Sequence, residues 1–259
     1  MRKVYAGTAA GKPDATFWSD NWKDFSVGQM VALCEKDPVV KLLRRFSPRE
    51  GRILDAGCGL GQNVIYMRGL GFDMEGVDFS AELISRAMAY DGSLPVKTAD
   101  LKALPFPCGY FKAYYAGGVI EHFEEGPQAV LKEASRVLAG DGVLMITVPY
   151  LNMKRRIEDF FRPVRPGCDF YEYMFTQKEM RGILFKNNFK VFYSQPFSLM
   201  AGLYDFKAVK SVARPGRRYP AALKRFFAQE EAGAPPAKLL LAIARICFGH
   251  MAFFACRKS

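Results

Sequence analysis

Short apolar runs and longer amphipathic runs follow one another through the middle of the chain. Short apolar runs, rich in β-branched residues, are typical of buried strands, whereas apolar positions three and four apart are typical of helices. The short runs predict strands at 53–56, 73–78, 96–99, 113–116, 143–148 and 189–193. The longer runs predict helices at 62–68, 80–88, 127–138 and 176–186. Strands separated regularly by helices predict an α/β fold whose mostly parallel sheet carries helices on both faces.

Helix-start signals support these boundaries. Ser80 is suited to an N-cap, and Pro127 is suited to the first turn of the next helix. Thr176, with Glu179 three residues later, forms the pattern of a capping box.

The two ends of the chain have a different pattern. Residues 1–25 show no clear period and are interpreted as an arm or lid, whereas apolar spacing over 26–46 predicts a helix broken near Pro38. Near the other end, 238–246 predicts an apolar helix and 251–255 a last strand. Charged residues interrupt 237–256, so we expect a helix and a strand there rather than a membrane span.

One glycine-rich loop suggests the chemistry. Three alternate glycines follow the first predicted strand in the segment Asp55-Ala56-Gly57-Cys58-Gly59-Leu60-Gly61. Gln62 stands where a dinucleotide-binding loop would place its third glycine, and Asp55 would repel a pyrophosphate. Asp78, at the end of the second strand, is placed to accept both hydroxyls of a ribose. The pattern predicts a nucleoside ligand that carries positive charge, and S-adenosylmethionine fits that description.

Further motifs occur in a consistent order, and with them the chain resembles the class I S-adenosylmethionine-dependent methyltransferases. The branch that it resembles includes ubiquinone-biosynthesis-type and other small-molecule methyltransferases, and the likeness covers roughly residues 50–195. The motifs after the glycine loop and Asp78 are Ala99-Asp100-Leu101, Gly118-Val119-Ile120-Glu121-His122-Phe123, the run from Arg136 to Pro149, and Phe175-Thr176 with Glu179.

The resemblance implies a Rossmann-like, seven-stranded, mostly parallel sheet with an antiparallel last strand. The pattern of the two ends adds the expectation of an N-terminal helical lid and an insertion before that strand. We expect a lid and helices at 1–50, a donor-binding core at 51–195, and an insertion and last strand at 196–259 that complete the same domain. The cofactor would be S-adenosylmethionine. The residues expected to bind it are Asp55, Ala56, Gly57, Cys58, Gly59, Gly61, Asp78, Phe79, Asp100, Leu101, Gly117 and Gly118.

The acceptor side is less defined. His122 stands where the transferable methyl group should lie, so its neutral imidazole is a candidate general base. Glu121 is a second catalytic candidate, as a hydrogen-bond partner for the loop or the donor. Aromatic residues near the expected binding edge are candidates for the acceptor pocket: Trp18, Trp22, Tyr150, Tyr171 and Tyr173. Six dispersed cysteines and two histidines give no zinc-site pattern, so no metal is expected.

Charge adds a clue about the second substrate. The chain has 37 Lys+Arg against 26 Asp+Glu, a net charge of +11, and the donor site does not account for it because its expected ligands are acidic. Cations gather in Lys207–Arg225, which is interpreted as a solvated face, a binding segment for an anionic acceptor, or a surface for RNA or an anionic membrane. Apolar residues beside these cations favour a lipid-like or membrane partner over RNA.

The sequence therefore predicts in-line methyl transfer to an oxygen, nitrogen or carbon atom. The acceptor would be a small-molecule, lipid-like or sugar-linked compound. The alternatives are an RNA methyltransferase that uses the 207–225 segment, and a non-catalytic donor-binding protein. The start of the chain lacks a secretory signal pattern, so we expect a cytoplasmic protein, with peripheral membrane association as a variant of this hypothesis.

Overall fold

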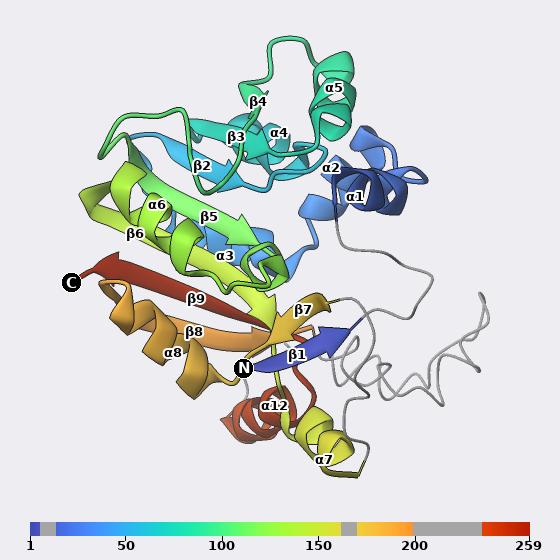
Figure 1. The fold of residues 1–259 in the computed structure, drawn as a ribbon, viewed down its shortest axis with the longest axis vertical. Helices are drawn as coiled ribbons and strands as arrows, with labels where there is room; N and C mark the ends of the chain where they lie inside the picture. Colours follow the sequence, from blue (N-terminus) through green and yellow to red (C-terminus); the bar gives the residue numbers. More distant parts are fainter. Residues whose placement is uncertain (6–13, 162–169, 199–234) are drawn as a thin grey trace.

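A seven-stranded sheet organises the protein. The computed structural model describes residues 1–5, 14–161, 170–198 and 235–259 (Figure 1). The strand order is β4-β3-β2-β5-β6-β9-β8. The strands are β2 (Ile53–Ala56), β3 (Met74–Asp78), β4 (Val96–Thr98), β5 (Phe111–Gly117), β6 (Leu138–Pro149), β8 (Phe189–Phe197) and β9 (Met251–Lys258). Strand β9 runs antiparallel to both β6 and β8, whereas β2 to β6 pair in parallel. This confirms the predicted fold class and the antiparallel last strand.

Helices cover both faces of the sheet. One face carries α3 (Pro38–Phe46), α4 (Gln62–Gly69) and α5 (Ala81–Tyr90), with α2 (Val27–Cys34) packed on α4. The other face carries α6 (Gln128–Val137) and α8 (Gln177–Lys186). In Figure 1, α6 and α8 lie in front of the sheet and α3 lies behind it.

The side chains of a single strand divide between the two resulting cores. On β5, Tyr114 and Ala116 belong to the core under α6 and α8, whereas Ala113 and Tyr115 belong to the core under α3 and α4. Successive residues of a strand point to opposite faces, so a strand buried on both sides is apolar at nearly every position. This explains why the central strands are continuous apolar runs in the sequence.

Local capping fixes where the helices begin. The Ser80 hydroxyl accepts a hydrogen bond from the Leu83 amide at 3.3 Å, and Thr176 and Glu179 form a complete capping box. The predicted break near Pro38 is confirmed, because α2 ends at Cys34 and a new helix begins at Pro38.

Some elements were not predicted. Strand β1 (Arg2–Tyr5) pairs antiparallel with β7 (Phe170–Met174) in a separate two-stranded sheet, and helix α1 (Ala15–Trp22) lies within the stretch interpreted as an arm. Helix α7 (Met153–Phe161) was also missed. Leu138 was assigned to the end of a helix, but it is the first residue of β6, since α6 ends at Val137. It pairs with Phe111 of β5, a tertiary contact that local spacing does not reveal.

The second half of the chain is described only in part. Helix α12 (Pro235–Phe248) and strand β9 confirm the helix and strand predicted there. The basic segment Lys207–Arg225 lies outside the described residues. The domain boundaries at 50 and 195 stay a prediction. Within the described ranges, none of the helices is long and apolar enough to cross a membrane.

Candidate functional site

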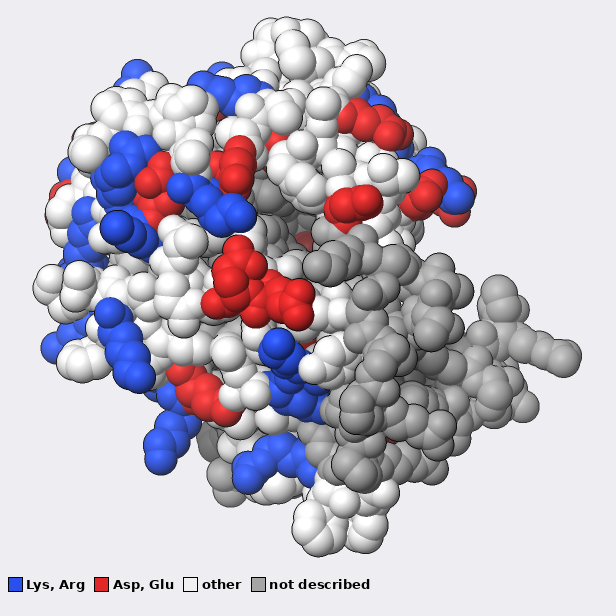
Figure 2. Space-filling model, in the orientation of Figure 1, with Lys and Arg blue, Asp and Glu red and all other residues white. Residues whose placement is uncertain are grey.

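A cavity of about 920 Å³ opens at the carboxyl ends of the central strands. The loops after β2, β3, β4 and β5 line it, and residues of α1, α2 and α4 also contribute. In a sheet of this kind, ligands bind at the carboxyl edge, where the strand order reverses. Figure 2 shows acidic side chains around the hollow at the centre of this face.

The glycine loop lies at the floor of the cavity. Gly57, Gly59 and Gly61 all have left-handed backbone angles, with φ of 86°, 55° and 71°. Gly57 is further confined by Val119, because a Cβ at Gly57 would lie 2.4 Å from Val119 Cγ2. The turn therefore requires glycine both for its backbone angle and for its close approach to the loop after β5.

Asp78 ties the end of β3 to this loop. Its Oδ2 accepts a hydrogen bond from the Gly59 amide at 2.9 Å, and its Oδ1 accepts one from the Ser80 amide at 2.9 Å. Burial raises the pKa of Asp78, while these amide hydrogen bonds lower it. Each carboxylate oxygen can accept a second hydrogen bond, so the group is held in place and still open to a ligand diol.

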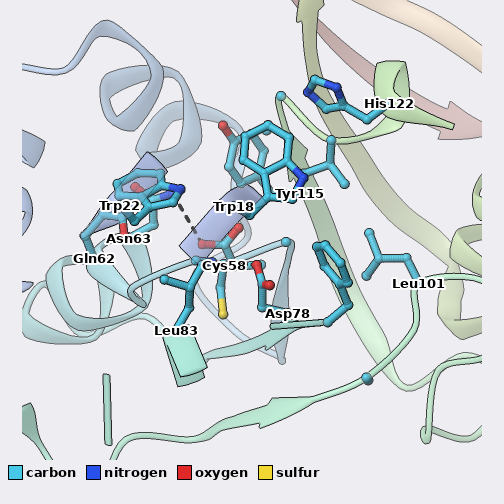
Figure 3. A pocket seen from close by; sticks show the side chains of 18 of the residues that line it. Trp18, Trp22, Cys58, Gln62, Asn63, Asp78, Leu83, Leu101, Tyr115 and His122 are labelled. Atoms are coloured by element: carbon cyan, nitrogen blue, oxygen red, sulfur yellow. Dashed lines mark hydrogen bonds between the residues drawn. The ribbon is translucent and has the colours of Figure 1, made fainter. Parts of the chain in front are cut away.

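Asp55 is the more deeply buried acid. It is 1% exposed, and Asn63 Nδ2 of α4 donates a hydrogen bond to its Oδ2 at 3.3 Å (Figure 3, dashed line). Burial raises the pKa of Asp55 to about 7, the Asn63 hydrogen bond lowers it, and the charge of Asp78 raises it further. A cation next to Asp55 would favour its ionised form.

The described wall of the cavity supplies little positive charge. Among the described lining residues, Lys102 is the one lysine or arginine, and its ammonium lies 3.6 Å from Glu125 Oε1. Within this described lining, the buried carboxylates Asp55 and Asp78 therefore have no lysine or arginine other than Lys102 in the same cavity. A ligand that brings its own positive charge would offset their desolvation.

Further residues expected to bind the cofactor lie at the carboxyl ends of β3, β4 and β5. Phe79, Asp100, Leu101, Gly117 and Gly118 all line the cavity. The backbone amide of Lys102 donates a hydrogen bond to Asp100 Oδ1 at 2.9 Å, which fixes that turn. The structure brings these residues, which are far apart in sequence, to one cavity, and their contact with the cofactor stays a prediction.

Two tryptophans, both on helix α1, form the wall of the cavity opposite Asp78. Trp18 and Trp22 line the cavity, and a Cβ at Gly59 would lie 3.9 Å from the Trp22 ring. Arg86 of α5 anchors this element by donating hydrogen bonds to the carbonyl oxygens of Trp22 and Phe25, at 3.1 and 2.5 Å. Figure 3 shows both indoles beside the cavity, opposite Asp78.

His122 lies on the short helix η1 (Ile120–His122) that follows β5. Its Nδ1 is 2.8 Å from the Tyr171 carbonyl oxygen, and the Trp18 ring meets the imidazole edge-on at 4.8 Å between centroids. Burial lowers the pKa of His122, so the neutral imidazole is favoured. Its role as a general base stays a prediction.

Other predicted site residues do not line the cavity. Ala56, the last residue of β2, is buried in the core under α6 and α8, and Glu121 is buried. Tyr171 contacts the far side of the His122 ring. Tyr173 donates a hydrogen bond from its hydroxyl to the Glu124 carbonyl oxygen at 2.7 Å, and Tyr150 packs in the core near α7. Gly61 is likewise outside the cavity lining, where a Cβ would meet Leu94, Ala87 and Val96. These six residues therefore lie outside the cavity wall.

Sequence reasoning missed several lining residues, among them Asn63, Asp37 and Glu125. Asn63 could have been found, because it lies in the first turn of the helix that follows the glycine loop and so faces the preceding strand end. Asp37 caps α3 through the Val39 amide, and its place on the cavity wall depends on how α2 and α3 pack.

These features fit S-adenosylmethionine. The left-handed glycines allow a ligand to approach the backbone, Asp78 presents a fixed carboxylate for a ribose, and Asp55 presents a buried carboxylate to a cationic end. A phosphate-bearing ligand would meet repulsion from both acids.

Comparisons with known proteins agree with this geometry. Residues 54–146 match the family model described as a methyltransferase domain. The chain is 31% identical over 104 residues to a malonyl-[acyl-carrier protein] O-methyltransferase of Enterobacter lignolyticus, which covers 40% of this chain and 39% of the relative. The corresponding enzyme of Legionella pneumophila is 30% identical over 132 residues, covering 46% and 44%. The chain thus spans less than half the length of these curated relatives.

Solved structures show the same fold. A SAM-dependent methyltransferase from Archaeoglobus fulgidus superposes with a TM-score of 0.56 at 17% identity, covering 94% of this chain and 99% of the other. An S-adenosylmethionine-dependent methyltransferase from Mesorhizobium loti gives 0.56 at 17% identity, covering 87% and 100%. The chain therefore contains a methyltransferase domain of the class I, S-adenosylmethionine-dependent fold.

Proposed function

We propose that this protein transfers a methyl group from S-adenosylmethionine to an oxygen, nitrogen or carbon atom of a small-molecule, lipid-like or sugar-linked acceptor. One observation carries the proposal. Two buried carboxylates from adjacent parallel strands, Asp55 and Asp78, meet a left-handed glycine loop in a single cavity.

The protein's contribution to such a reaction is alignment in a dry site. The donor, when bound, supplies a methyl group already activated by the positive sulfur. Asp78 and the glycine loop would hold the nucleoside, and Asp55 would attract the cationic end. Trp18 and Trp22 would exclude water from the opposite side. Fixed orientation and water exclusion are sufficient catalytic devices when the leaving group is already activated.

We further propose an anionic acceptor. Two observations support this: the relatives named above act on malonyl-[acyl-carrier protein], and the chain carries a surplus of eleven positive charges. The described cavity wall does not supply the matching cations, so Lys207–Arg225 is the segment that we assign to this task. Peripheral binding to an anionic membrane is a related proposal for the same cations.

A transfer assay tests the function directly. The purified protein is incubated with a size-fractionated lysate and S-adenosylmethionine labelled in its methyl group, and labelled products are identified by mass spectrometry. We expect label in an anionic small molecule or carrier-linked compound. Label chiefly in RNA, sensitive to ribonuclease, would overturn the proposed acceptor class. Donor binding without any labelled product would favour the non-catalytic alternative.

The membrane proposal has its own test. Sedimentation with vesicles that contain phosphatidylglycerol should carry the protein down, and replacing the Lys207–Arg225 cations with Gln should abolish this. Sedimentation that these substitutions leave unchanged would contradict a role for the segment.

A further inference from the structure

Three potential metal ligands converge behind the mouth of the cavity. Glu121 and His122 of η1 and Glu172 of β7 each place one ligand atom within 4.8 Å of the other two. Neighbouring residues of both elements, Glu124 and Phe170, line the cavity. The cluster contains carboxylates and one imidazole, so the absence of a cysteine–histidine pattern in the sequence does not bear on it.

Hydrogen bonding orients the imidazole toward the cluster. The Tyr171 carbonyl oxygen can only accept a hydrogen bond, so His122 Nδ1, at 2.8 Å, carries the proton. The lone pair of the neutral ring then lies on Nε2, which is 4.0 Å from Glu121 Oε1. A histidine that donates its other ring N–H to a backbone carbonyl is the usual arrangement of a metal ligand. The Trp18 and Tyr171 rings, 4.8 and 5.3 Å away, hold the imidazole in this orientation.

Glu121 gives the independent sign of a missing ligand. Its side chain is 2% exposed, and Oε2 has no hydrogen-bond partner among the described residues. A buried carboxylate oxygen without a partner is costly, and buried carboxylates are normally paired or coordinate a metal. Glu172 brings a second carboxylate within 4.8 Å, so a cation held between the two side chains would offset their mutual repulsion.

The spacing suits a small cation. When three atoms are no more than 4.8 Å apart, some point lies within about 2.8 Å of all of them, against the ~2.0–2.2 Å of zinc–nitrogen and zinc–oxygen bonds. Side-chain shifts of about half an ångström would close this gap. Imidazole with carboxylates suits first-row transition metals such as Mn²⁺ and Zn²⁺ better than Ca²⁺, which takes oxygen ligands alone.

We propose that Glu121, His122 Nε2 and Glu172 bind a divalent transition-metal cation, such as Mn²⁺ or Zn²⁺, beside the donor cavity. Three protein ligands leave coordination positions open, and open positions are typical of sites that bind a substrate oxygen. A carboxylate, phosphate or hydroxyl oxygen of the acceptor is the ligand expected there. This last role rests on the proposed function, whereas metal binding itself does not. A cation bound to His122 Nε2 would occupy the lone pair that a general base requires, so His122 would not act as the base while the metal is bound.

Mn²⁺ binding tests the proposal without an activity measurement. The full chain, treated with a chelator and then dialysed, is titrated with Mn²⁺ while electron paramagnetic resonance follows the free ion. We expect one saturable site per chain, displaced by Zn²⁺. Glu121→Gln, Glu172→Gln and His122→Gln should each weaken Mn²⁺ binding at least tenfold, because each removes one ligand.

Matched variants and donor binding separate this result from misfolding. Glu125→Gln, on the same loop but paired with Lys102, should bind Mn²⁺ like the wild type. The Glu121→Gln chain should still bind S-adenosylhomocysteine in the absence of metal, which shows that the fold and donor site are intact. Absence of saturable binding at millimolar Mn²⁺, or equal binding by wild type and all ligand variants, would overturn the metal site and leave the proposed methyl transfer untouched.

Discussion

Replacing Gly57 with alanine tests the glycine loop at its most constrained position. Gly57 has φ of 86°, and its missing Cβ would lie 2.4 Å from Val119 Cγ2. Two costs therefore add: the left-handed angle costs an L-residue about 1–2 kcal/mol, and overpacking against Val119 costs about 1–3 kcal/mol more. We expect Gly57→Ala to lower the free energy of unfolding by about 2–5 kcal/mol.

Gly71 provides a matched control. It has nearly the same backbone angle, φ of 84°, but an added Cβ would meet no atom within 4 Å. Gly71→Ala should therefore cost only the backbone part, about 1–2 kcal/mol. It lies beyond α4, away from the described cavity lining, so its donor affinity should equal that of the wild type.

Val119→Ala provides the second control, since it removes the methyl group that the new Cβ would strike. In the double variant the overpacking term should largely disappear, which gives a favourable coupling energy of about 1–3 kcal/mol in a double-mutant cycle. Val119 itself lines the cavity, so the cycle is read from stability and not from donor affinity.

Urea unfolding followed by circular dichroism measures the stabilities, and calorimetry with S-adenosylhomocysteine measures the affinity. Gly57→Ala should bind at least tenfold more weakly than Gly71→Ala. Equal destabilisation in the two single variants, with no coupling between Gly57→Ala and Val119→Ala, would refute the steric reasoning.

Three further predictions follow from the same structure. The pKa of Asp55 is raised to about 7, so its protonated form gains population as pH falls below that value. The affinity for S-adenosylmethionine should therefore drop several-fold from pH 8 to pH 6. Binding titrations across this range should show the drop in the wild type and not in Asp55→Asn. Arg86→Ala removes the hydrogen bonds that anchor the Trp22 segment, so donor affinity should fall about tenfold. Tryptophan fluorescence can follow donor binding, because the only two tryptophans of the chain, Trp18 and Trp22, line the cavity. Unchanged affinity would contradict the anchoring role. Thr176→Ala removes the α8 capping bond and should cost about 1 kcal/mol in urea unfolding without changing donor affinity.

The parts of the fold that the sequence predicts are those determined by nearby residues. Apolar runs buried on both sides, such as β2 and most of β5, are visible because nearly every position avoids water. Ser80 and Thr176 bond to amides three residues away, so their patterns remain in the local sequence. The donor loop is equally local, because its glycines and Asp55 are consecutive or nearly so.

The missed parts depend on pairing between distant segments. Strand β1 is formed by the first residues of the chain and, within the described residues, pairs with β7. Because its partner is about 170 residues away, no local period reveals the strand. Glu172 also lies near Glu121 and His122 only through tertiary packing, which the local sequence does not reveal. Of the aromatic residues predicted to line the acceptor pocket, Trp18 and Trp22 line the cavity, whereas Tyr150 and Tyr173 do not. The direction in which such a side chain points depends on tertiary packing.

Calorimetric titration with S-adenosylmethionine and S-adenosylhomocysteine tests the central claim most directly. We predict micromolar binding of both by the wild type, at one site per chain. Asp78→Ala should abolish binding, because it removes the carboxylate that we expect to hold the ribose and releases the Gly59 amide. Unchanged urea unfolding of Asp78→Ala would show that the loss is local. No binding by the wild type, or undiminished binding by the variant, would contradict the account.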